Sequence, residues 1–131
     1  MQSHDFSLLE MQQNIHELIA QQHPLEETLA AITDWVSLMM PGALVSIMRY
    51  DPQSECLNLV PSPVFSRRFT EQMQNIPIGE NKGTCGTSAF TGKPVITDNI
   101  AKDPRWGGYH DLARDEGLGA CWSAPILTHN N

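Results

Sequence analysis

The stretch GENKGTCGTSAFTGKPVITDNI, residues 79–100, limits the possible fold more than any other part of the sequence. Its glycines surround a cysteine, Cys85, at a point where a short helix can begin. Thr84 belongs to the residue types that cap helix N-termini, and Gly92 to those that end helices. The stretch therefore predicts a short helix between these two residues, followed by a strand over residues 95–98.

Two amphipathic helices are predicted before this stretch. In the first, residues 5–22, apolar side chains recur at steps of three and four, the spacing of a narrow coiled-coil seam. The seam consists of Leu8, Met11, Ile15 and Leu18. We expect this helix either to form a homodimer with a second copy or to pack on the rest of its own domain. The second helix is predicted to start at Pro24, with His23 as its cap, and to end at Pro41.

The rest of the chain predicts short strands and helices in alternation. The expected elements are a hairpin of strands over residues 44–50 and 56–60, a helix over 66–74, an edge strand over 76–78, a helix over 109–116, a strand over 118–127 and a turn over 128–131. With the opening helices and the central stretch, the order is ααββαβαβαβ. Because 131 residues suit one domain and no shift in composition divides them, a single α+β domain is expected.

The charge balance argues against two classes of partner. The chain carries 15 acidic and 8 basic residues, a net charge of −7, and its only basic doublet is Arg67-Arg68. Nucleic acids and anionic membrane surfaces both require clustered lysine and arginine. The first residues lack the layout of a signal peptide, and no apolar run is long enough for a membrane span. We therefore expect no nucleic-acid partner, no membrane and a cytoplasmic location.

The cysteines and histidines form no metal or cofactor pattern. Three cysteines stand far apart, at positions 56, 85 and 121, without a C-x-x-C pair. Such an odd, scattered set predicts free thiols in a reducing compartment. Zinc sites use closely spaced cysteine or histidine pairs, and haem would need an axial ligand such as His110. No metal and no cofactor are predicted.

Four short motifs stand in order from the central helix onward. They are Gly83–Gly86 (GTCG), Gly92–Val95 (GKPV), Asp103–Trp106 (DPRW) and Cys121–Ile126 (CWSAPI). Together they resemble the GAF domain family, and most of all the GAF domains joined to bacterial histidine kinases and to enzymes that make or break cyclic di-GMP. The paired opening helices and the hairpin agree with that family over the rest of the chain.

The resemblance implies a fold and a function. The fold is α+β, with one central antiparallel sheet, the N-terminal helices on one face, and short helices and loops forming a pocket on the other. Residues 1–131 would be a single sensor domain without the family's final strand and C-terminal helix, and so the front of a larger protein. The implied function is non-catalytic, namely sensing a small molecule to regulate a bacterial signal-transduction protein. Catalysis would belong to an output domain such as a histidine kinase, a diguanylate cyclase or a phosphodiesterase.

Nine residues are candidates for binding an unidentified small-molecule ligand. The helix start presents free backbone amides, which suit a carboxylate, a phosphate or a carbonyl. The aromatic loop beside Gly107 and Gly108 has the residue types of a ligand lid, although Trp106 could instead anchor that loop on the core. Alternation puts two candidates of the late strand on one face and Trp122 on the other. The candidates are Thr84, Cys85, Ser88, Trp106, Tyr109, His110, Asp111, Cys121 and Ser123.

Two other functions remain open. A cysteine-based redox enzyme or thiol sensor would use Cys85 and Cys121, whose Cα atoms would have to lie within about 7 Å to form a disulfide. The free methionine-(R)-sulfoxide reductases are catalytic GAF domains, but where the resemblance places their catalytic cysteine, residues 113–115 read Ala-Arg-Asp. A purely structural dimerisation module would have no ligand cavity. In the sensor interpretation, Cys85 is only a small side chain at the rim of a pocket.

Overall fold

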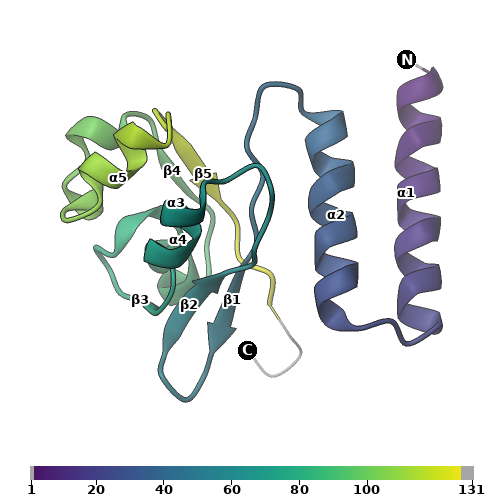
Figure 1. Cartoon of the computed structure of the whole chain (residues 1–131), viewed down its shortest axis with the longest axis horizontal. Coiled ribbons are helices and arrows are strands. Elements are labelled where there is room, and N and C mark those ends of the chain that lie inside the picture. The colour runs from purple at the N-terminus through teal and green to yellow at the C-terminus, as the bar shows by residue number, and fades with distance from the viewer. Residues whose placement is uncertain (1, 128–131) are drawn as a thin grey trace. The chain divides into compact units, whose positions relative to one another are not determined.

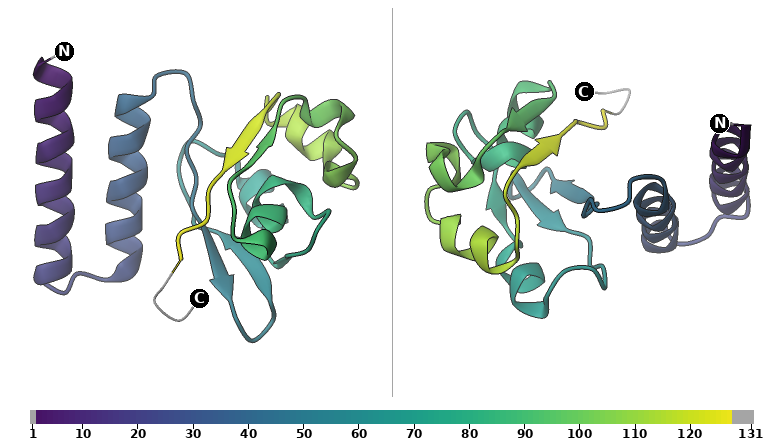
Figure 2. Two further views of the ribbon diagram at one scale, coloured as in Figure 1. Left: turned by 180° about the vertical axis from the view of Figure 1, so that it is seen from behind. Right: turned by 90° about the horizontal axis from the view of Figure 1, so that it is seen from above.

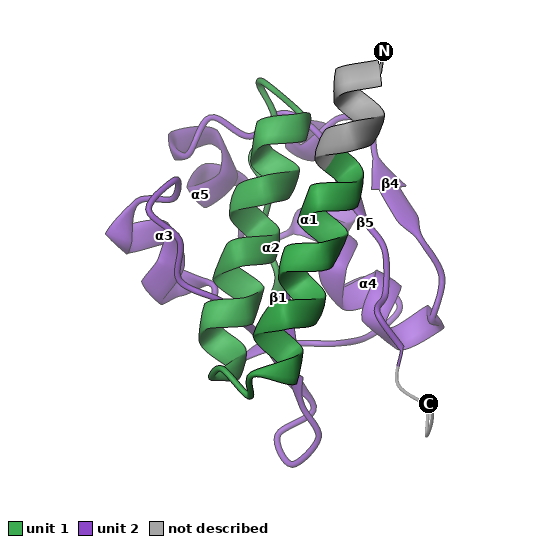
Figure 3. Ribbon diagram, turned by 90° about the vertical axis from the view of Figure 1, so that its right-hand side faces the viewer, with its two compact units in different colours: residues 1–47 green, residues 48–131 purple. Residues whose placement is uncertain are grey.

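The computed structural model describes residues 2–127, with side chains from residue 8 onward. The chain forms two compact units, residues 1–47 and 48–131 (Figure 3). The elements follow the predicted order ααββαβαβαβ, with two short 3₁₀ helices added between β4 and α5 (Figure 1). The turn predicted over residues 128–131 lies outside the described residues.

The first unit is a helical hairpin of α1 (Gln2–Ala20) and α2 (Leu25–Met39), which pack side by side (Figure 1). The helices are joined by a tight turn in which Gln22 has a φ of 57°. Pro24 precedes the first helical residue instead of occupying it, and an imidazole nitrogen of His23 lies 2.8 Å from the Glu27 carboxylate. The two predicted helices are confirmed, with their bounds shifted by a few residues.

The seam predicted on α1 is half-buried at Met11, Ile15 and Leu18, in agreement with the packing of α1 on α2. Other apolar side chains of the hairpin remain outside, since Leu9 is 64% exposed and Leu38 is 77% exposed. The buried residues of α2 are threonines, at positions 28 and 33. Helix α1 therefore packs on α2 of the same chain, which is one of the two expected outcomes. Homodimer formation stays a prediction.

The second unit begins with a three-stranded antiparallel sheet of β1 (Met48–Asp51), β2 (Cys56–Leu59) and β3 (Ile76–Pro77), in that order. Between β2 and β3 lies α3 (Arg67–Gln72), which Ser66 caps by accepting a hydrogen bond from the backbone N–H of Phe69. The main core packs α3 and α5 against this sheet. Its buried members are Leu57, Leu59, Phe65, Phe69, Met73, Ile76 and Leu112.

The other strands, β4 (Val95–Thr97) and β5 (Cys121–Ser123), form a separate antiparallel pair (Figure 2). Helix α4 (Gly83–Thr91) packs against both of them. The chain between β4 and β5 contains η1 (Ile100–Lys102), η2 (Pro104–Trp106) and α5 (His110–Asp115). A small second core of Ile100, Trp106 and Ala113 holds this segment together.

Three expectations about the strands are corrected. The described strands form two sheets instead of one, and the strand predicted over residues 118–127 is reduced to β5. No described strand pairs with the chain after Ser123, Pro125 has no N–H to donate, and Ile126 is largely exposed. The strand predicted over residues 44–50 likewise starts only at Met48, because its partner Leu59 is the last residue of β2. The placement of the opening helices over a sheet face stays a prediction.

Candidate functional site

The start of α4 differs from the prediction in the role of Thr84. The helix begins at Gly83, and Thr84 is not its cap but a fully buried member of the first turn. Its hydroxyl accepts a hydrogen bond from the indole nitrogen of Trp106 at 2.9 Å and lies 2.7 Å from the hydroxyl of Thr97. The far end of the helix agrees with the prediction, because Gly92 is the C-cap with a φ of 72°.

The Asp103–Trp106 motif is a compact turn tied to β4. The Asp103 carboxylate accepts hydrogen bonds from the backbone N–H of Arg105 at 2.9 Å and from its Nη2 at 2.6 Å. That side-chain bond is the main reason that the pKa of Asp103 is lowered to about 2. The same Nη2 donates to the carbonyl of Ile96 and the hydroxyl of Thr97, both at 3.2 Å. The ion pair therefore fixes the turn in place on the strand.

These bonds join into one network around the Thr84 hydroxyl. Thr97 receives a hydrogen bond from Arg105, and Thr84 receives one from Trp106. The Thr84 hydroxyl also contributes to lowering the pKa of Cys121, which links the network to β5. Among the described residues, no buried side-chain polar atom lacks a partner. Such a fully satisfied network specifies one arrangement of its residues.

A cavity of about 150 Å³ lies beside this network within the second unit. Its walls come from the start of α4, from the Asp103–Trp106 turn, from β1 and β3, and from the residue that follows α3. The lining residues are Met48, Met73, Ile76, Pro77, Asn81, Lys82, Gly83, Thr84, Cys85, Gly86, Pro104, Arg105, Trp106, Gly107 and Tyr109. A cavity of about this volume in another protein accepts benzene. The space therefore suits a small ligand with an apolar body.

Of the nine candidate residues, the cavity walls contain Thr84, Cys85, Trp106 and Tyr109. Trp106 is only 6% exposed and belongs to the second core, so it anchors its loop as well as lining the cavity. Anchoring of the loop on the core is the second role that the sequence analysis considered for Trp106.

The other five candidates lie outside the cavity walls. Ser88 donates its hydroxyl proton to the carbonyl of Lys93, and His110 bonds through Nε2 to the carbonyl of Asp103 at 2.8 Å. Asp111 is exposed and pairs with Arg114 at 3.2 Å. Cys121 and Ser123 share the inner side of β5, opposite the exposed Trp122, as alternation predicts. They meet Cys85 behind the cavity wall.

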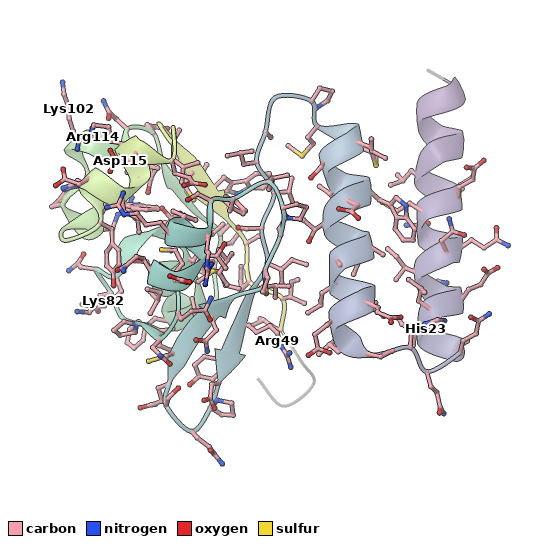
Figure 4. The ribbon with its side chains drawn as sticks, in the orientation of Figure 1. His23, Arg49, Lys82, Lys102, Arg114 and Asp115 are labelled. Atoms are coloured by element: carbon pink, nitrogen blue, oxygen red, sulfur yellow. The ribbon has the colours of Figure 1, made fainter. Side chains whose placement is uncertain are left out.

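The sequence interpretation missed the part of the wall that comes from distant elements. Met48 lies on β1, Met73 follows α3, and Ile76 and Pro77 form β3. Nothing in their local pattern distinguishes them from ordinary core residues. Lys82, which Figure 4 labels, stands next to the Gly83–Gly86 motif, and Arg105 lies within the Asp103–Trp106 motif, so the motifs could have suggested both.

Two of the three cysteines meet at one hydroxyl group. The Oγ of Ser123 lies 2.9 Å from the sulfur of Cys85 and 3.9 Å from the sulfur of Cys121. The pKa of Cys121 is lowered, first by its hydrogen bond with Cys85 and then by Thr84 and Ser123. The pKa of Cys85 is raised well above its ordinary value by the same pairing and by burial. Both thiols are free and half-buried. The third, Cys56, lies on β2.

A comparison with known protein families identifies the family to which this chain belongs. The family model described as "GAF domain" matches residues 22–131. The chain belongs to the GAF family. It is also 33% identical over 121 residues to a protein of the archaeon Methanosarcina acetivorans named "Methyl sulfide methyltransferase-associated sensor". That match covers 92% of this chain but only 12% of the relative.

Membership in the GAF family confirms the recognition made from the four motifs and the α+β fold class. Within residues 2–127, no helix combines the length and the hydropathy that a bilayer span requires. Among residues 8–127, whose side chains the structure describes, no group of three or more histidine, cysteine or acidic side chains is arranged to hold a metal ion.

Proposed function

We propose that this GAF domain is a non-catalytic regulatory module that binds a small molecule in the cavity beside Thr84 and Trp106. The observation that carries the proposal is the cavity itself, which is lined in part by the family motifs at the start of α4 and at the Asp103–Trp106 turn. The name of the archaeal relative, a sensor, supports the same role. The proposed location is the cytoplasm, where thiols remain reduced.

The ligand is proposed to act by favouring one arrangement of the cavity walls. A ligand shifts an equilibrium only when it binds two conformations with unequal affinity. The walls come from segments far apart in the sequence, including Met48 and Trp106, so closing them around a ligand would change how those segments pack. The regulated activity is proposed to lie elsewhere in a longer signal-transduction protein, such as a histidine kinase or a cyclic di-GMP enzyme.

A thermal-shift screen with compounds of about the size of benzene tests this proposal. A ligand present at 100 times its Kd stabilises a folded protein by about 2.7 kcal/mol. We expect the shift to disappear in Met48→Trp, which fills the cavity, and to remain in Met40→Trp, a matched change at an exposed methionine of the other unit. A shift that survives in Met48→Trp would place the ligand elsewhere.

We further propose that α1 mediates a homodimer. The helix keeps Leu9 and Ile19 largely exposed, and a surface groove on the hairpin is lined in part by Met11 and Leu38. A second copy would remove these apolar side chains from water, at about 25 cal/mol per Å² of area buried. Light scattering should show a dimer for the wild-type chain and a monomer for the double variant Leu9→Glu/Ile19→Glu. If light scattering shows that the wild-type chain is a monomer even at high concentration, then the proposed homodimer is contradicted.

A further inference from the structure

Cys85, which lines the cavity, and Cys121, which does not, are brought together by the fold and not by sequence proximity. Cys85 comes from the first turn of α4, Cys121 comes from β5, and α4 packs directly against β5. Both sulfurs lie within 4 Å of the Ser123 hydroxyl, and both thiols are free. Their shared contact with one oxygen atom brings the two thiols into the same small region of the fold.

The surroundings give the two sulfurs different roles. The Oγ of Ser123 lies 3.9 Å from the sulfur of Cys121, and the pKa of Cys121 is lowered, first by Cys85 and then by Thr84 and Ser123. Thr84 is itself held in place by Trp106 and Thr97. Cys85 retains its proton more strongly, so Cys121 is the nucleophile of the pair and Cys85 is its partner. The charge of the Cys121 thiolate also contributes to the raised pKa of Cys85.

We propose that Cys85 and Cys121 form a redox-modification site at which a hydroperoxide oxidises the two thiols to a disulfide. The Cys121 thiolate attacks the terminal peroxide oxygen, the O–O bond breaks, and the alkoxide or hydroxide that leaves takes up a proton. The resulting sulfenic acid of Cys121 is then attacked by the sulfur of Cys85. Its hydroxyl group leaves as water with the proton of Cys85, and the S–S bond forms.

The electrons balance over the two steps. The thiols lose two electrons and two protons, and the hydroperoxide is reduced to an alcohol, or to water when the oxidant is hydrogen peroxide, with one further water. The disulfide would replace the contact between Cys85 and Ser123. Because Cys85 also lines the cavity, oxidation is expected to change ligand binding. That consequence rests on the proposed sensing function, whereas formation of the disulfide does not.

The test is peptide mapping of the whole chain after exposure to a slight excess of hydrogen peroxide. We expect a disulfide between the peptides of Cys85 and Cys121, reversed by a dithiol reductant, with Cys56 still open to alkylation. Because this measurement uses the wild-type protein, it does not depend on whether any variant folds. A disulfide that involves Cys56, or oxidation of Cys121 only to sulfinic acid, would overturn the proposal.

Variants separate the roles of the two thiols. In Cys85→Ser, Cys121 should accumulate as a sulfenic acid that a dimedone probe traps. In Cys121→Ser, peroxide should consume Cys85 at least tenfold more slowly than in the wild type. The matched control is Cys56→Ser, which leaves the pair intact and should behave like the wild type. Equal rates of Cys85 oxidation in Cys121→Ser and Cys56→Ser would contradict the assigned roles.

Discussion

The helical hairpin and the site around Thr84 use opposite means to hold their parts together. In the hairpin, neighbouring turns of two helices meet along a half-buried seam, and large side chains such as Leu38 remain in water. Around Thr84, buried polar side chains from α4, β4 and η2 bond to one another. The first arrangement tolerates variation, whereas the second requires particular atoms at particular places. We therefore expect substitutions in the two regions to differ sharply in cost.

The largest difference is expected between Trp106→Ala and Leu38→Ala. Trp106 is buried in the second core, and deleting such a ring costs about 3–5 kcal/mol. Leu38 is exposed on α2, and its truncation should change stability by about 0.5 kcal/mol or less. Urea unfolding followed by fluorescence and circular dichroism measures both. If the two variants lose the same free energy of unfolding, then the two regions do not differ in their tolerance of substitution.

A smaller effect is expected from Thr84→Val, which keeps the shape of the side chain but removes its hydroxyl. The indole N–H of Trp106 would then lose its acceptor inside the protein, at a cost of about 1–3 kcal/mol. Thr84→Ser retains the hydroxyl and is the matched control. If the two variants unfold at the same urea concentration, then the bond from Trp106 does not contribute to stability.

The pH dependence of Asp103→Asn gives a third test. Because Arg105 lowers the pKa of Asp103 to about 2 in the folded protein, the ionised carboxylate stabilises the fold above the unfolded pKa of about 3.9. The advantage of the wild type over Asp103→Asn should thus be constant near neutral pH and shrink as the pH falls from about 4 towards 2. A pH-independent difference would contradict the role of the ion pair.

The smallest effect is expected from Leu9→Glu/Ile19→Glu on the unfolding of dilute, monomeric protein. Both side chains are exposed on α1, so each change should alter stability by about 0.5 kcal/mol or less. At high concentration the same variant should lose the additional stability that dimer formation gives the wild type. Melting temperatures measured over a range of protein concentrations separate the two effects.

The same contrast explains what the sequence could predict. The order of elements and the C-cap at Gly92 follow from local signals such as periodicity and turn residues, and both were predicted correctly. Thr84 was predicted to be a helix cap on the same local grounds. Its hydroxyl is used instead by Trp106 and Thr97, which a local rule does not see.

The cavity was harder to predict than the motifs beside it. Thr84, Cys85 and Trp106 belong to family motifs, so the resemblance placed them near a pocket. Met48 and Met73 complete the wall from β1 and from the end of α3, and their place depends on how the sheet and α3 pack. Packing between distant segments carries no local signal, and a methionine fits almost any core.

The central claim is that the cavity beside Trp106 is the ligand site, and the indole N–H signals of the three tryptophans test it directly. Trp106 lines the cavity, whereas Trp35 lies on α2 and Trp122 is on the exposed face of β5. When a compound found by the thermal-shift screen is titrated into ¹⁵N-labelled protein, the indole signal of Trp106 should move with saturation while the other two stay in place. A saturable change at Trp35 or Trp122 with none at Trp106 would contradict the account.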